Sequence, residues 1–144
     1  EWAHCTCAVP LRRAEVKKGR GRALIDLRHG KPSETDFRVK ESFGDIAWIE
    51  AFPHTGRLHQ IRLHLKSLGV PILWDDAYWD REWKSEYFPD LSPISLPLHA
   101  RELRFVHPFG GAEVKIECPM EEGMRNLLNE LKKRSEGLTA ELGE

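Results

Sequence analysis

The segment TGRLHQIRLH, residues 55–64, is the part of the sequence that decides how the rest is interpreted. It holds two arginines, two histidines and a glutamine, and no acidic residue. A solvent-facing helix usually mixes both signs of charge, because opposite charges three or four positions apart stabilise each other. Since this segment gathers only cationic and hydrogen-bonding groups, we expect its acidic partner to lie elsewhere.

A helix is predicted from Leu58 to Leu68, because helices commonly end at a glycine followed closely by a proline, as at Gly69 and Pro71. At about 100° per residue, Arg62 lies about 40° from Leu58. This places Arg62 at the edge of the face that is predicted to be buried. That face consists of Leu58, Ile61, Leu65 and Leu68.

A half-buried arginine is costly unless a carboxylate or a phosphate pairs with it. The positions three and four residues away from Arg62 hold no acid. Its partner therefore comes from a distant Asp or Glu of the fold, from a ligand, or from residues outside this chain. Helical spacing leaves these three possibilities open.

Thr55, Gly56 and Arg57 precede the predicted helix, where free backbone N–H groups and the helix dipole favour an anion. Arg57 adds a positive charge, so a phosphate site is one interpretation. A simple helix cap by Thr55 is the other. His59 and His64 are five positions apart and share no helix face, so we do not predict a metal site on this helix.

The whole pattern predicts an α+β fold with a largely antiparallel or mixed sheet flanked by helices. Residues 34–43 alternate in polarity and connect through Gly44-Asp45 to the apolar run 46–52, which indicates a β-hairpin. A C-terminal helix is predicted over residues 121–134, with an apolar face of Met124, Leu127, Leu128 and Leu131. Shorter strands are predicted at residues 5–9, 22–27, 98–106 and 112–118, and irregular segments at 12–22, 28–33 and 74–97. We expect one domain, residues 1–134, and a disordered tail, residues 135–144.

The composition, 40% hydrophobic and 31% charged, is that of an ordinary globular domain. No apolar run is long enough to span a bilayer, and no secretory leader is visible. We therefore expect a cytoplasmic protein. Cys5, Cys7 and Cys118 lack the spacing of zinc ligands and are expected to be reduced thiols.

The net charge is −1, but residues 11–40 contain ten Lys or Arg against four Asp or Glu. Such a basic stretch can contact the phosphates of a nucleic acid while the rest of the surface stays neutral. A solvated charged loop is the alternative interpretation.

Three further segments strengthen the pattern. GKPSET, residues 30–35, precedes the central segment, and GVPILWDDAY, residues 69–78, follows it. Leu-His-Ala at 98–100 and His-Pro at 107–108 come later. Together these motifs resemble the RluA-type RNA pseudouridine synthases over about residues 8–131. Trp74 stands where that family usually has Gly, a residue that often marks a backbone conformation others avoid.

The resemblance implies the C-terminal part of a catalytic domain that isomerises uridine to pseudouridine in ribosomal or transfer RNA, without a metal or an organic cofactor. The family's catalytic Asp, in an Arg-Leu-Asp-x-x-Thr-Ser-Gly motif, and its Tyr beside the target base are missing from this sequence. Because the chain begins at Glu1 rather than Met, we expect N-terminal elements to be missing. By resemblance, Arg62 is catalytic and pairs with that missing Asp, so the chain alone is expected to be inactive.

The other expected roles divide into two groups. Leu98 is expected to line the uracil pocket. Contacts with RNA are assigned to Arg57, His59, Gln60, Leu98, Arg12, Arg13, Lys17 and Lys18, and structural motif roles to Thr55, Gly56, Asp75, Tyr78 and His99. Two other functions remain open at this point. One is a non-catalytic RNA-binding or scaffold protein that retains the fold, and the other is a metal hydrolase that uses the histidines.

Overall fold

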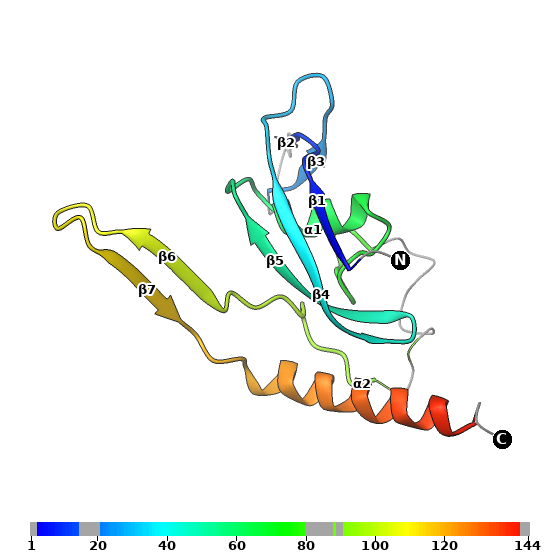
Figure 1. The fold of residues 1–144 in the computed structure, drawn as a ribbon. Helices are drawn as coiled ribbons and strands as arrows, with labels where there is room; N and C mark the ends of the chain where they lie inside the picture. The colour runs from blue at the N-terminus through cyan, green and yellow to red at the C-terminus, as the bar shows by residue number, and fades with distance from the viewer. Residues whose placement is uncertain (1–2, 15–20, 80–87, 89–90, 142–144) are drawn as a thin grey trace.

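A computed structural model describes residues 3–14, 21–79, 88 and 91–141. The described residues form one three-stranded sheet, two separate β-hairpins and two helices, and every strand pairing is antiparallel (Figure 1). The α+β class is therefore confirmed. The sheet has the strand order β1 (His4–Cys7), β4 (Thr35–Phe43), β5 (Ile46–Pro53). One hairpin pairs β2 (Leu11–Arg13) with β3 (Ala23–Ile25), and the other pairs β6 (Glu102–Val106) with β7 (Glu113–Glu117). The two helices are α1 (Gln60–Ser67) and α2 (Glu122–Glu141).

The β4–β5 hairpin forms as the sequence predicts. Gly44 has a φ of 67°, a left-handed conformation that suits glycine in a tight connection. Thr35 and Phe37 are fully buried, whereas Arg38 and Lys40 of the same strand are exposed. The alternation along β4 therefore places one face of the strand in the core.

Helix α1 packs against the sheet through a face that differs from the predicted one. The helix begins at Gln60 instead of Leu58, because His59 has a left-handed backbone conformation with φ 52°. Leu58 is 40% exposed, so centring the buried face on it was wrong. The buried residues of α1 are Gln60, Leu63, His64 and Leu65, so half of this face is polar.

The end of α1 follows the predicted signals. Gly69 has a φ of 78°, its N–H donates to the carbonyl of Lys66, and the N–H of Val70 donates to the carbonyl of Leu65. This is the Schellman arrangement, which satisfies the last carbonyl groups of a helix. A few residues later Trp74 also has a positive φ, 55°, as its place at the family's glycine position suggested.

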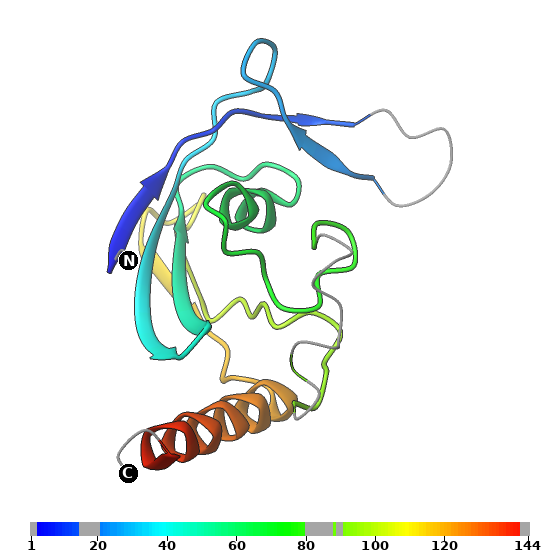
Figure 2. The same cartoon turned by 90° about the vertical axis from the view of Figure 1, so that its right-hand side faces the viewer.

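Helix α2 lies across the turn end of the β4–β5 hairpin (Figure 2). Leu127 and Leu131 are buried against Phe43 and Ile46, which confirms the apolar face of this helix. The helix continues to Glu141. The prediction of a disordered tail was therefore wrong for residues 135–141.

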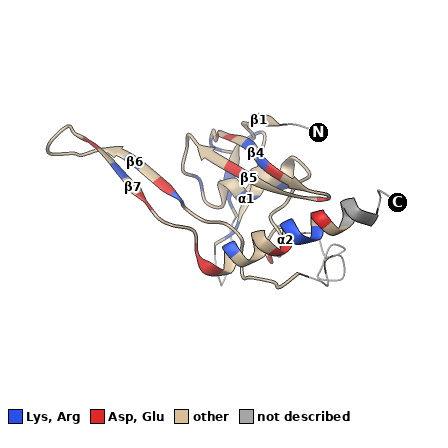
Figure 3. Ribbon diagram, turned by 60° about the horizontal axis from the view of Figure 1, so that its bottom comes forward, with Lys and Arg blue, Asp and Glu red and all other residues tan. Residues whose placement is uncertain are grey.

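The β6–β7 hairpin projects away from the rest of the fold, and charged residues of both signs lie along it (Figures 1 and 3). Its strands begin later than predicted, at Glu102 and Glu113. Within the described ranges, no helix is long and apolar enough to cross a membrane.

Replacement of Phe37 tests the packing of the sheet against α1, since this ring lies in a cluster with Cys7, Leu65 and Ile72. Phe37→Ala is expected to lower the free energy of unfolding by about 3–5 kcal/mol, because it leaves a cavity. Phe37→Leu is expected to cost about 1–2 kcal/mol, and the exposed Lys40→Ala at most about 0.5 kcal/mol. Urea denaturation of the three variants measures these values. Equal losses for Phe37→Ala and Lys40→Ala would contradict the assignment of the core.

Candidate active site

Arg62 pairs with Asp75, which lies in the turn that follows α1. Nε of Arg62 donates to Oδ2 of Asp75 at 2.8 Å, and Nη2 donates to Oδ1. The Asp75 side chain is 1% exposed and that of Arg62 is 14% exposed. The partner of Arg62 in this structure is therefore a distant acid of the same fold. This corrects the inference that the partner is missing from the chain, while the catalytic role of Arg62 remains a prediction.

The environment of the pair keeps both groups charged. Burial by itself would raise the pKa of Asp75, but hydrogen bonds from Arg62 and from the amide of Ala77, together with the charge of Arg62, lower it on balance. The hydrogen bond to Asp75 is the main cause that raises the pKa of Arg62. Oδ1 of Asp75 also accepts the N–H groups of Ala77 and Tyr78, at 3.0 and 3.1 Å. Nη1 of Arg62 bonds to none of the described residues.

The Tyr78 ring packs against the guanidinium group of Arg62 in this ion pair. The guanidinium carbon of Arg62 lies 4.9 Å from the centre of the Tyr78 ring, a cation–π contact. The Tyr78 hydroxyl group accepts the N–H of Ala23 at 3.0 Å and lies 2.7 Å from Nδ1 of His59. Burial, followed by the charge of Arg62, lowers the pKa of His59. His59 is therefore a neutral imidazole beside the arginine near pH 7.

Gln60 connects α1 to the sheet. Its Nε2 donates to the carbonyl of Glu34 and to Oγ1 of Thr35, both at 2.9 Å. Its Oε1 accepts the Thr55 hydroxyl group at 2.7 Å and the Arg57 N–H at 3.0 Å. Both ends of this buried amide therefore bind protein groups. The structure thus gives Gln60 a structural role, and the RNA contact assigned from the sequence stays a prediction.

His64 is fully buried and bonded through both ring nitrogens. Ser33 donates its hydroxyl hydrogen to the carbonyl of Val9, so Nε2–H of His64 donates toward these two groups, 3.1 Å from each. Nδ1 then accepts the hydroxyl hydrogen of Thr35 at 2.9 Å. Burial lowers the pKa of His64, which keeps this neutral form stable. The His64 ring therefore holds α1 against the start of β4 and the segment that follows β1.

The expected phosphate site before α1 takes a different form. No side chain caps α1, and the Thr55 hydroxyl group instead accepts the N–H of Glu34 and donates to Gln60. The structure thus corrects the capping interpretation of Thr55. Arg57 is exposed, and its Nε donates to the carbonyl of Pro32 at 3.1 Å. The guanidinium of Arg57 is thus held at the surface, and Gly56 beside it faces open space.

The predicted basic loop is partly a hairpin. Arg12 and Arg13 lie in strand β2, and Nε of Arg12 donates to Asp26 at 2.8 Å. Lys17 and Lys18 lie outside the described residues. His99 is partly buried, and its Nε2 bonds to the carbonyl of Cys118 at 3.0 Å, which ties the segment before β6 to the residue after β7.

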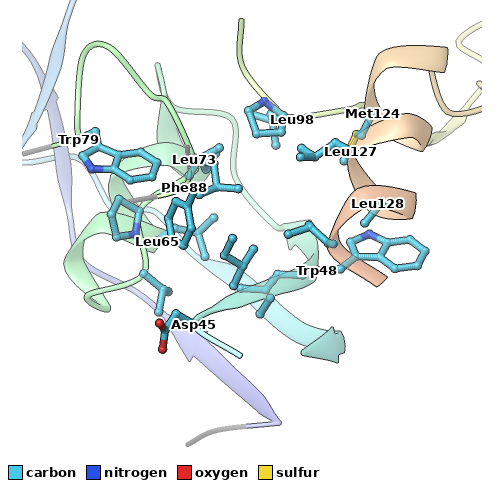
Figure 4. A pocket seen from close by; sticks show the side chains of 18 of the residues that line it. Asp45, Trp48, Leu65, Leu73, Trp79, Phe88, Leu98, Met124, Leu127 and Leu128 are labelled. Carbon is cyan, nitrogen blue, oxygen red and sulfur yellow. The ribbon is translucent and has the colours of Figure 1, made fainter. Parts of the chain in front are cut away.

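Leu98 is 40% exposed and lines an apolar groove of about 680 Å³ between β5, α1 and α2 (Figure 4). Trp48, Leu73 and Leu127 line the same groove. Arg62 is not among the described residues that line this groove. Across the described part of the chain, no group of three His, Cys, Asp or Glu side chains is arranged to hold a metal ion.

The chain is similar to known proteins both in sequence and in fold. Residues 13–67 match the family model described as RNA pseudouridylate synthase. Ribosomal large subunit pseudouridine synthase C of Escherichia coli K12 is 42% identical over 104 residues, which are 72% of this chain and 33% of that protein. The protein of the same name from Pasteurella multocida is 36% identical over 136 residues, 93% of this chain and 41% of that protein. The chain thus spans about a third to two fifths of the length of these relatives.

Two solved human structures share the fold. Human RNA Pseudouridylate Synthase Domain Containing 1 superposes with a TM-score of 0.65 and 24% identity, over 92% of this chain and 60% of that one. Human RNA Pseudouridylate Synthase Domain Containing 4 gives a TM-score of 0.59 and 23% identity, over 90% and 57%.

Two neighbouring aspartates provide a matched test of the ion pair. Asp75→Asn is expected to lower the free energy of unfolding by about 3–5 kcal/mol, because it leaves the half-buried Arg62 charge uncompensated. Asp76 is 93% exposed and 3.7 Å from Nη2 of Arg62, so Asp76→Asn is expected to cost at most about 0.5 kcal/mol. Chemical denaturation of both variants measures the difference. Similar losses for the two would show that Asp75 is not the main partner.

Three histidines are expected to titrate in a defined order. His54 has a raised pKa, because it bonds to Asp36, whereas His59 and His64 have lowered values. Neutral His59 and His64 stabilise the folded state above about pH 6.5, the pKa of a histidine in an unfolded chain. This stabilisation is lost as the pH falls through the lowered pKa values of the two residues. The smaller contribution of the exposed His54 is present below that pH and is lost as the pH rises through its raised pKa.

Proton NMR of the imidazole C–H groups, followed from pH 8 to pH 5, measures this order. A pKa of His64 above that of His54 would contradict the buried network. Denaturation at pH 5 and pH 7.5 provides the corresponding stability measurement, with the lower stability expected at pH 5.

Proposed function

Since the chain belongs to the RluA-type family of RNA pseudouridine synthases, we propose that it forms part of an enzyme that isomerises uridine to pseudouridine in large-subunit ribosomal RNA. The relatives named above are large-subunit enzymes, which favours ribosomal over transfer RNA as the substrate. The reaction breaks the bond between N1 of uracil and C1′ of ribose and forms a bond from C5 to C1′, while C5 loses its proton and N1 gains one. It changes no oxidation state, so the proposal includes no redox cofactor.

The observation that carries this proposal is the way Arg62 is held. Asp75 binds one edge of its guanidinium group and the Tyr78 ring supports its face. Among the described residues Nη1 has no bonded partner, so it can take a second carboxylate. A fixed guanidinium beside a carboxylate favours the ionised form of that acid. We therefore assign Arg62 to hold a catalytic Asp, supplied by a segment outside this sequence, in its charged form.

Asp75 itself does not fit the role of that catalytic acid. Its carboxylate accepts two hydrogen bonds from Arg62 and two from backbone amides, and its side chain is 1% exposed. A nucleophile or base must reach the substrate with a free lone pair. Asp75 thus orients Arg62, and the reacting carboxylate is a different one.

Exposed basic residues provide the expected contacts with RNA. Arg57 lies at the surface beside α1, and the side chain of Arg12 on β2 is 44% exposed. Contacts of this kind bind phosphates and orient the nucleic acid without reading its sequence. Base flipping would then present the uridine to Arg62.

The proposal is tested with a chimera in which this chain replaces the 136 matching residues of the Pasteurella multocida relative. Pseudouridine is measured by mass spectrometry in large-subunit ribosomal RNA and in transfer RNA. The chimera is expected to modify ribosomal RNA, and the chain alone to produce no pseudouridine. Arg62→Lys is expected to lower kcat by about 100-fold or more, because a charge that acts in the transition state is misplaced.

Arg38→Lys, on the exposed face of β4, is the matched control and is expected to retain full activity. RNA binding by the Arg62→Lys chimera is expected to stay within about threefold of the unsubstituted chimera. Turnover by the chain alone would refute the need for an external acid. A chimera that binds RNA without modifying it would favour the scaffold function.

A further inference from the structure

We propose that Tyr78 is a positioning residue whose hydroxyl group fixes the basic β2–β3 hairpin relative to Arg62. The inference rests on the proposed function, since it concerns how RNA held by the hairpin is placed against the reacting site. It gives a specific role in substrate alignment to a residue that sequence reasoning treated as structural.

The first step is the coupling of Tyr78 to Arg62. The N–H of Tyr78 donates to the same Asp75 oxygen that accepts Nη2 of Arg62. The Tyr78 ring lies 4.9 Å under the guanidinium carbon and is 6% exposed as a residue. One carboxylate therefore fixes both the Arg62 guanidinium group and the Tyr78 backbone, and the ring contact joins the two side chains directly.

The second step is the coupling of Tyr78 to the hairpin. Its hydroxyl oxygen accepts the N–H of Ala23 at 3.0 Å, and its O–H lies 3.3 Å from the carbonyl oxygen of the same residue. Ala23 pairs in register with Arg13 of β2. The Tyr78 hydroxyl group thus bonds to both the N–H and the carbonyl group of Ala23. These two groups lie on the edge of β3 that faces away from β2. In Figure 2 the β2–β3 hairpin extends away from the three-stranded sheet on the α1 side.

His59 adds a third contact to the same hydroxyl group. Its Nδ1 lies 2.7 Å from the Tyr78 oxygen, and the two rings meet edge to face with centres 5.4 Å apart. His59 is also the residue whose left-handed backbone begins α1. A left-handed conformation is costly for a residue other than glycine, and the bond to Tyr78 helps to hold it. Tyr78 consequently joins the start of α1, the ion pair and the hairpin.

The apolar contacts of Tyr78 separate this positioning role from simple packing. The ring lies in a buried cluster with Leu11, Ala23 and Leu63, which keeps the hairpin against α1. Tyr78→Phe retains that ring and its contact with Arg62 but removes the hydroxyl group. We therefore expect Tyr78→Phe to fold, with the hairpin less tightly fixed to the site.

Hydrogen exchange in the isolated chain provides the first test, and it is independent of activity. The Ala23 amide is expected to exchange about tenfold faster in Tyr78→Phe, with the amides of Phe37 and Leu65 unchanged. Thr6→Val is the matched control, because it removes a hydroxyl group that bonds to Asp36 on the other side of the sheet. Unchanged exchange at Ala23, or a uniform increase at all three amides, would overturn the proposal.

Kinetics of the chimera provide the second test. Tyr78→Phe is expected to raise KM for RNA about five- to tenfold with kcat within about threefold, the loss of roughly one hydrogen bond in substrate alignment. Arg62→Lys instead lowers kcat. An unchanged KM would overturn the positioning role, even with altered exchange at Ala23.

An inactive chimera would contradict the proposed function alone. The affinity of the chain for a large-subunit ribosomal RNA fragment then decides the inference. A five- to tenfold weaker affinity in Tyr78→Phe supports it, and an equal affinity overturns it.

Discussion

The ion pair of Arg62 with Asp75 is the interaction on which the candidate site depends. Two charges lie at the edge of the core, where either one alone would be costly. Their pairing is possible because α1 ends at Ser67 and the chain reverses after the left-handed Gly69, so that Asp75 returns to the side of the helix that carries Arg62. The backbone amides of Ala77 and Tyr78 complete the carboxylate's hydrogen bonds. The pair thus fixes the guanidinium group before any substrate is bound.

The motif at residues 55–64 separates into two functional halves. Gln60 and His64 face the sheet, where they bind Thr35 and neighbouring backbone groups in a fully satisfied polar core. Arg62 and His59 face the turn that holds Asp75 and Tyr78. The first half sets the position of α1 on the sheet, and the second uses that position to hold a charge. This explains why so many polar side chains are concentrated in one short helix.

Sequence reasoning found the features whose causes are local. The β4–β5 hairpin, the end of α1 and the apolar face of α2 follow from alternation, glycine conformation and helical spacing. It failed where polar groups replace apolar ones in the core. The helical wheel was centred on Leu58 because it assumed that only apolar residues define a buried face, whereas Gln60 and His64 are buried by hydrogen bonding to β4.

The partner of Arg62 was missed for a different reason. Helical spacing describes contacts within one helix, and Asp75 reaches Arg62 only after the chain reverses. The family motif did single out Asp75 and Tyr78, but a motif match carries no geometry. A double-mutant cycle between Arg62→Met and Asp75→Asn, measured by urea denaturation, tests the central interaction most directly. A coupling energy of about 2–3 kcal/mol is expected. Additivity within about 0.5 kcal/mol would contradict the account.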